Sequence, residues 1–297
     1  MSSIKAVAIG NIGRSKGLAT SKSAKSINLT SILLTALIII AALLWLFPLY
    51  WAVATSVKTE QATVGPLQLW PASLSLDTYW KVFTTTNIVT WYFNSVCVSL
   101  IITFAILAIS VCCAYALSQL RFPGRKLLLG MMVACVMVPM EALIVNHFVL
   151  MNAFGFINTW QGIILPQLVA PAAVIIFKQF FDQIPKDYRE AAMLDNAGHF
   201  KILFSIYLPM NLGVITAIGI TTFIAAWNNF LWPFLVATSQ STMTIPVGIT
   251  QVHDTYGIHF ASDMAMAVLA GLPVAVLYLV FQRRITNAIM LSAGIKG

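Results

Sequence analysis

The sequence predicts an all-α integral membrane protein with six transmembrane helices. Of its 297 residues, 59% are hydrophobic and only 9% are charged, whereas soluble globular domains carry about 25% charged residues. Six apolar runs each reach the roughly 20 residues that a helix needs to cross a bilayer core. With six spans drawn, 15 of the 17 Lys and Arg residues fall on one side of the membrane, which predicts that this side is cytoplasmic.

The N-terminal segment, residues 1–26, is a basic tail. It is rich in Ser, Lys and Gly and holds five basic residues and no acid, so it is predicted to be disordered. The apolar run that follows, at about 27–57, is roughly twice as long as a signal-peptide core of about 7–15 residues. We therefore expect an uncleaved first span, although Ala-Val-Ala at 52–54 resembles a cleavage site.

Five further runs complete a membrane domain over residues 27–297. The predicted spans lie at about 89–118, 127–150, 159–181, 205–234 and 262–288. Because their number with the first is even, both termini are predicted to be cytoplasmic. The only Lys or Arg residues in the outer connectors are Lys58 and Lys81. Orientation in a membrane therefore explains the net charge of +8, and no nucleic-acid partner is predicted.

The four cysteines lie inside apolar runs, where a thiol most simply acts as a small packing residue. Their spacing fits neither a zinc site nor a redox motif. We expect no disulfide and no metal at Cys97, Cys112, Cys113 and Cys135.

The connector at 182–204 reads as a short helix, a turn and a second helix. Pro185 suits a first helical turn, and Glu190 lies near the positive end of the helix dipole. Asn196 and Gly198 are the residue types that best tolerate a left-handed backbone, so the first helix is expected to stop there. A second helix is expected to begin near His199 and to enter the membrane, with Pro209 early in the fifth span.

The first of these two helices also carries a candidate docking surface. Tyr188, Ala191 and Ala192 share one arc, with Asp195 in its middle. Two small residues on an exposed face would let another protein approach closely. The alternative is an ordinary surface elbow without a partner.

These residues resemble the EAA loop of bacterial ABC-importer permeases. The resemblance rests on Glu190-Ala191-Ala192 followed at the family spacing by Ile206 and Leu208-Pro209, with Asn196 where the family has Gly. Other stretches resemble the carbohydrate-importer branch, and more narrowly the smaller permease of maltose-type transporters. They are "LFPLYWAVATSVKT", "NSV" at 94–96, "YALSQLRFPGRK", "AAWNNFLWP" and the terminal "GIKG".

The resemblance implies a subunit of a larger transporter in a bacterial inner membrane. Its expected partners are a second permease, a dimer of cytoplasmic ATPase subunits, an extracytoplasmic solute-binding protein and a carbohydrate substrate. The residues implied to couple to the ATPase are Glu190, Ala191, Ala192, Asp195, Asn196 and Gly198. The resemblance also places Lys296 and Gly297 against the ATPase, although a frayed polar terminus is the alternative.

No enzymatic activity is expected of this chain. It contains no Gly-rich phosphate loop of the GxxxxGK[ST] kind, so ATP and Mg²⁺ are expected on the ATPase partner and no cofactor on this chain.

Polar residues inside spans are costly and mark substrate pathways by default. Glu141 is the only acid in the middle of a predicted span and is expected in the outer half of the third span. The other candidates at similar depth are Asn94, Asn146, His147, Trp227, Asn228 and Asn229. Amide and aromatic groups suit a sugar, which needs paired hydrogen bonds and a stacking surface. Alternatively, Trp227 is an interfacial aromatic residue, Asn228 a helix cap and His147 a residue at the water boundary.

Two other function classes compete with a transporter subunit. A self-contained secondary transporter or channel is disfavoured because no inverted repeat is evident and only one mid-span acid could couple protons. A membrane enzyme is disfavoured because no nucleophile–base pair, metal cluster or paired carboxylates occur at membrane depth.

Overall fold

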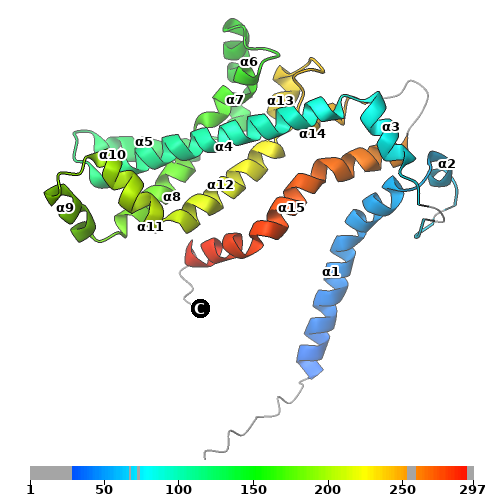
Figure 1. Cartoon of the computed structure of the whole chain (residues 1–297), viewed down its shortest axis with the longest axis horizontal. Coiled ribbons are helices and arrows are strands. Elements are labelled where there is room, and N and C mark those ends of the chain that lie inside the picture. Colours follow the sequence, from blue (N-terminus) through cyan, green and yellow to red (C-terminus); the bar gives the residue numbers. More distant parts are fainter. Residues whose placement is uncertain (1–28, 67, 72–73, 253–258, 293–297) are drawn as a thin grey trace, which may run out of the picture. The chain divides into compact units, whose positions relative to one another are not determined.

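The computed structural model describes residues 29–66, 68–71, 74–252 and 259–292, with side chains up to residue 282. All regular secondary structure in these ranges is helical (Figure 1), so the all-helical prediction is confirmed. The predicted tail at 1–26 and the residues Lys296 and Gly297 lie outside the described ranges.

Three helices are each long and apolar enough to cross a membrane without interruption. They are α1 (Leu29–Ser56), α4 (Ile88–Gln119) and α15 (Phe260–Ser292). Their bounds lie within four residues of the runs predicted at 27–57, 89–118 and 262–288.

Three further candidate spans are pairs of helices separated by a sharp bend. The bend is 92° between α5 (Arg125–Val136) and the pair η1 (Met140–Leu143) and α6 (Ile144–Ala153). It is 47° between α7–η2 (Trp160–Ile164, Leu165–Leu168) and α8 (Pro171–Asp182). It is 83° between the helix at His199–Met210 and α12 (Leu212–Trp227). The described residues therefore hold three spans, or up to six if each bent pair is one span.

A proline stands at each bend. Pro139 precedes η1, Pro171 is the first residue of α8, and Pro209 lies one residue before the end of the helix that precedes α12. Proline has no N–H to continue a helical ladder and its ring crowds the preceding turn, which favours a break. Pro209, which the sequence places early in the fifth predicted span, thus lies two residues before the break at Asn211.

The helix before α12 is itself irregular. It consists of α10 (His199–Ile202), a π-helix η3 (Leu203–Tyr207) and α11 (Leu208–Met210). The remaining helices are short and lie in connectors: α2 (Glu60–Thr63), α3 (Asp77–Thr85), α9 (Lys186–Leu194), α13 (Leu231–Val236) and α14 (Ile245–Gly248).

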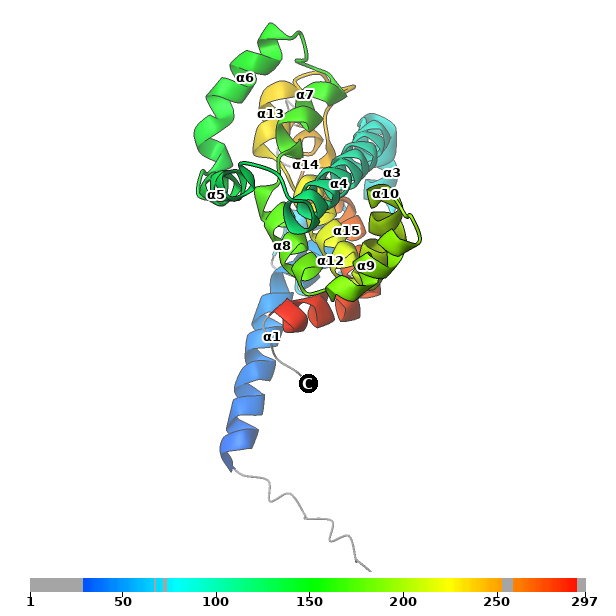
Figure 2. The same ribbon diagram turned by 90° about the vertical axis from the view of Figure 1, so that its left-hand side faces the viewer.

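The chain divides into two compact units between Pro48 and Leu49. The first contains the N-terminal part of α1, whose described side chains are exposed. The second contains every other element and is organised around α4, against which α8 and α12 pack (Figures 1 and 2).

The core of this second unit consists of three clusters of buried apolar side chains along α4. Ile88 and Trp91 belong to the first, Val98 and Ile102 to the second, and Ala114 to the third. Because α4 contributes to all three, it fixes the elements at its two ends. Figure 1 shows α9 and α10 at its C-terminal end and α3 and α14 at its N-terminal end.

Candidate functional site

The turn after α9 has the backbone that its sequence predicts. Asn196 has φ 55°, in the left-handed region. Its N–H donates to the carbonyl of Met193, and the N–H of Ala197 donates to the carbonyl of Ala192, both at 3.0 Å. These two bonds define a Schellman motif, in which Asn196 occupies the position that usually holds Gly. Gly198 differs from expectation, because its φ is −69° and it is the N-cap of α10.

The two alanines of the predicted docking surface point in different directions. Ala191 is exposed, whereas Ala192 is half-buried and packs with Ala197 against the core cluster at the end of α4. The prediction of a flat surface made by both alanines is therefore wrong. The reason is tertiary: one face of α9 must cover the apolar residues that α4 and α8 leave at this end.

Contacts from α4 hold the second arm of the turn. The hydroxyl of Tyr115 lies 3.2 Å from Nδ1 of His199 in α10. The Tyr115 ring also meets the ring of Tyr207 edge to face, with centroids 5.2 Å apart. These contacts fix α10 and η3 against α4, so the turn is carried on a packed base.

The end of α4 is closed by polar contacts to the same region. The Arg125 guanidinium donates to the carbonyl oxygens of Ser118 and Leu120, each at 3.2 Å. The Ser118 hydroxyl donates to the Asp182 carboxylate at 2.6 Å, and Lys178 pairs with the same carboxylate at 2.5 Å. A cation on the last carbonyls of a helix is favoured by the helix dipole.

Glu190 is exposed and lines a polar cavity of about 380 Å³ between α9 and the end of α4. Four basic residues line the same cavity: Arg121, Arg125, Lys186 and Arg189. A carboxylate among several guanidinium groups can accept charge-assisted hydrogen bonds and can exchange them for those of a partner. Asp195 is exposed beyond the end of α9.

Apolar side chains that sequence reasoning had not selected surround the turn. Leu194 is 89% exposed and Phe200 is 73% exposed, and Tyr188 and Met193 are about half exposed. Apolar side chains gathered on an exposed surface mark a site of interaction. The signal in the sequence was a pair of large apolar residues, Leu194 and Phe200, on either side of a mainly polar turn.

Among the predicted pathway residues, Glu141 and Asn146 are exposed in the chain. Glu141 lies in η1 at the 92° bend, and Asn146 follows in α6. Neither side chain has a hydrogen-bond partner among the described residues. The depth expected for Glu141 assumed a straight helix, whereas the helix bends by 92° between Val136 and Met140.

His147 and Trp227 make aromatic contacts. The His147 ring meets Trp232 edge to face, with centroids 6.0 Å apart. Trp227 is only 2% exposed, its Nε1–H donates to the carbonyl of Ala270 at 3.1 Å, and its ring stacks on Phe223. Trp227 therefore joins α12 to α15 and is not exposed as an interfacial residue would be.

Asn94 is buried and its amide is fully used. Its Nδ2 donates to the carbonyls of Ser241 (2.8 Å) and Met243 (2.9 Å), and its Oδ1 accepts from Trp160 Nε1 (3.2 Å). These bonds hold the connector after α13 against α4. Asn94 therefore acts as a structural cross-link in this chain.

Asn228 and Asn229 lie where α12 ends. Asn228 is exposed, and its backbone N–H closes the last turn on Ile224. Asn229 donates from Nδ2 to Oε1 of Gln167 at 2.6 Å. Gln167 lies in η2, beside the bend that precedes α8, so this bond joins one broken span to the C-terminal end of another. Sequence reasoning missed Gln167, although a Gln inside an apolar run follows the same rule that selected the asparagines.

The structure thus divides the pathway candidates into three groups. Glu141, Asn146 and Asn228 have exposed side chains. Asn229 and His147 each contact one other polar or aromatic side chain. Trp227 and Asn94 are committed to packing.

Among the described residues, the four cysteines are free thiols, and no group of three or more His, Cys, Asp or Glu side chains is placed to hold a metal ion.

Comparison with known proteins places these features in a family. Residues 106–289, more than half of the chain, match the family described as binding-protein-dependent transport system inner membrane component. The matched region includes α9, the turn and all three bends.

Curated relatives cover most of the chain. The sulfoquinovosyl glycerol transport system permease of Agrobacterium fabrum is 34% identical over 85% of this chain and 89% of its own length. The arabinooligosaccharides transport system permease of Halalkalibacterium halodurans is 32% identical over 92% of this chain and 99% of its own length. A crystal structure of a bacterial ABC transporter involved in the import of alginate contains a chain with the same fold. Its TM-score is 0.80 at 21% identity, over 88% of this chain and 98% of that one.

Proposed function

The chain belongs to the family of binding-protein-dependent transport system inner membrane components, and we propose that its cargo is a carbohydrate and that α9 receives the ATPase. It is a permease subunit of an ATP-driven ABC importer and a multi-pass protein of the inner membrane. It is not an enzyme, since a separate ATPase subunit hydrolyses the ATP in such importers. The permease itself carries no cofactor.

The proposal of a carbohydrate cargo is supported by the names of the relatives. One is a permease for sulfoquinovosyl glycerol and another a permease for arabinooligosaccharides. In this chain the broken spans and their ends carry amides, an imidazole and a carboxylate, at Gln167, Asn229, His147 and Glu141. Such groups can exchange hydrogen bonds with sugar hydroxyls.

The proposal that α9 is the coupling helix rests on one observation. A short helix closed by a Schellman turn presents Glu190 and exposed apolar residues. Ala192 packs its other side against the core, and Tyr115 holds α10, the helix that follows the turn. Because α9 packs against the core, a partner that binds its exposed apolar surface and moves α9 would also move α4 and α8. On this proposal the α9 side is cytoplasmic, as are both termini.

The proposed assembly contains a second permease subunit, two ATPase subunits and an external solute-binding protein. Lys296 and Gly297 are proposed to reach the ATPase. The sequence places 235–261 among the outer connectors, and this segment is proposed to lie on the side from which the binding protein delivers the cargo. ATP and Mg²⁺ are proposed to bind only to the ATPase partner.

Purification of the tagged subunit from its native membrane tests the assembly. We expect it to retain a second permease and an ATPase, and the ATPase to be stimulated by the cargo-loaded binding protein. Recovery of this chain alone, with uptake intact in reconstituted vesicles, would instead identify a self-contained carrier.

A charge reversal tests the docking helix within that assembly. Glu190→Lys should lower ATPase retention or uncouple hydrolysis from uptake, while membrane insertion is unchanged. Lys81→Glu is the matched control, because Lys81 is exposed on α3, away from α9. Full uptake and normal ATPase retention in the Glu190 variant would reject the docking proposal.

A further inference from the structure

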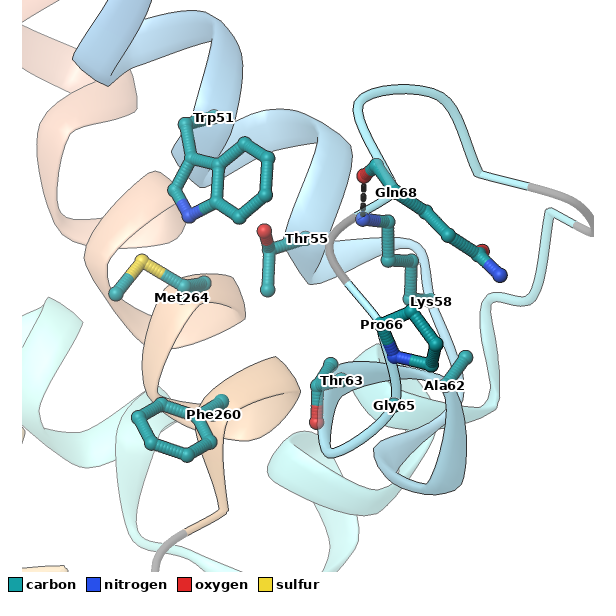
Figure 3. Close-up of a pocket in the computed structure, with 10 residues that line it drawn as sticks. All are labelled: Trp51, Thr55, Lys58, Ala62, Thr63, Gly65, Pro66, Gln68, Phe260 and Met264. Atoms are coloured by element: carbon teal, nitrogen blue, oxygen red, sulfur yellow. Dashed lines mark hydrogen bonds between the residues drawn. The ribbon is translucent and has the colours of Figure 1, made fainter.

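A second cavity, of about 350 Å³, lies beside the start of α15 (Figure 3). Trp51 and Thr55 contribute from the last turns of α1, and Phe260 and Met264 from the first turns of α15. The facing wall comes from the connector that contains α2, with Lys58, Ala62, Thr63, Gly65, Pro66 and Gln68. Neither the transport pathway nor α9 uses any of these residues.

The cavity contains a buried cation without a counter-ion. Lys58 is only 4% exposed. Its ammonium donates to the carbonyl of Gln68 at 2.6 Å and lies 4.9 Å from the centroid of the Trp51 ring. Among the described residues no carboxylate lies within 4.0 Å of it. An ammonium has three donors, and a buried charge is costly unless it is paired.

The nearest acid in the sequence is committed elsewhere. Glu60 accepts hydrogen bonds from the N–H groups of Ala261 (3.1 Å) and Ser262 (2.9 Å) and from the Ser262 hydroxyl (3.0 Å). It therefore caps the start of α15 and does not neutralise Lys58.

A second polar group of the cavity also lacks a partner. Thr55 is 5% exposed, and its hydroxyl has no hydrogen-bond partner among the described residues. Figure 3 shows Thr55 between Trp51 and Lys58. The opposite wall is apolar, formed by Phe260 and Met264. The cavity thus offers an ammonium and a hydroxyl within an apolar enclosure.

We propose that this cavity binds the phosphate of an anionic phospholipid headgroup. A phosphate oxygen would supply the missing counter-ion of Lys58 and accept from its free donors. The cavity lies at the C-terminal end of α1, where Trp51 and Thr55 line it, and Leu49 and Val53 on the same helix are 65% and 51% exposed. Acyl chains can lie along such an apolar face while the headgroup stays at the interface. Trp70 and Trp80, both about three-quarters exposed, belong to the same connector and are typical of a membrane interface.

The test uses the whole purified transporter, stripped of lipid in detergent. Its melting temperature and the lipid retained in native mass spectrometry are measured after adding phosphatidylglycerol, phosphatidylcholine, glycerol phosphate or inorganic phosphate. We expect phosphatidylglycerol to raise the melting temperature and to remain bound, and the other three additions to do neither. Equal stabilisation by inorganic phosphate or glycerol phosphate would reject a lipid ligand in favour of a soluble phosphate.

Variants of the two lysines locate the site. Lys58→Met should lower phosphatidylglycerol affinity about 10- to 100-fold, as expected for a lost charge-assisted hydrogen bond. Lys58→Arg should keep most of it. Lys81→Met removes the other cation of the predicted outer connectors and should have no effect. Ala62→Phe fills the cavity while leaving Lys58 in place, and it should abolish lipid retention as well. It serves as the test if the Lys58→Met transporter does not assemble. Undiminished retention in Ala62→Phe, or equal loss in Lys81→Met, would overturn the proposal.

Discussion

The side-chain amide of Asn229 donates to the side-chain oxygen of Gln167 at 2.6 Å. The two residues are 62 positions apart. Gln167 lies in η2, just before the bend that precedes α8, whereas Asn229 follows the C-terminal end of α12. The bond therefore joins the bend of one span to the end of another through two polar side chains.

Removal of this bond should weaken the transporter by a measurable pairwise amount. Hydrogen bonds between membrane helices contribute about 0.6 kcal/mol on average and up to about 1.7 kcal/mol. We expect a coupling free energy in this range from a double-mutant cycle of Gln167→Leu and Asn229→Leu, measured by denaturation of the reconstituted transporter. Strictly additive single-variant effects would show that the two amides do not act together.

Asn196 should tolerate Gly but not a β-branched residue. Its φ of 55° is open to Gly and costs an ordinary L-residue about 1–2 kcal/mol. Asn196→Gly should leave the ATPase coupled to uptake, whereas Asn196→Val should lower coupled ATPase activity because the turn is displaced. The ratio of ATP hydrolysed to cargo imported is the readout. Equal ratios in the two variants would mean that this turn does not set coupling.

Gly248→Ala should destabilise the chain strongly. A Cβ at this position would lie 2.2 Å from the Trp91 ring, and Trp91 is 1% exposed with its Nε1–H donating to the carbonyl of Gln240 at 3.0 Å. Overpacking of this kind costs about 1–3 kcal/mol or more. Gly213→Ala is the matched control, because nothing lies within 4 Å of its Cβ position. A melting curve that shifts down only for the Gly248 variant is expected.

Glu141→Gln should change uptake without changing assembly. Glu141 is exposed at the 92° bend and has no partner among the described residues, so its carboxylate is free to meet the cargo or a partner chain. Glu141→Asp keeps the charge and is expected to retain most uptake. Uptake of labelled cargo into vesicles separates the two variants, and wild-type uptake in both would assign Glu141 a packing role only.

The straight helices followed from the sequence because a continuous apolar run longer than about 20 residues leaves few other arrangements in a bilayer. Which prolines break a helix did not follow. Pro48 and Pro273 lie inside the continuous helices α1 and α15, whereas Pro139 and Pro171 stand at breaks. A proline removes one donor in every case, and whether the helix breaks depends on which neighbours satisfy the freed carbonyl groups.

The candidate site shows the same division between local and distant causes. The left-handed Asn196 was predictable, since a turn depends on a few adjacent residues. The inward direction of Ala192 was not, because it depends on apolar residues that α4 and α8 present. Asn94 is held by a connector almost 150 residues away, and no periodicity along one chain encodes such a pairing.

The contact between Glu60 and the start of α15 has a consequence for biogenesis. The carboxylate and the amides it accepts from are 201 and 202 positions apart, and α15 is the last described helix to leave the ribosome. The first outer connector is therefore in place long before the helix that it caps. Docking of that final helix brings it against the first outer connector. In a nascent chain that ends before α15, the Glu60 carboxylate therefore lacks its hydrogen-bond donors.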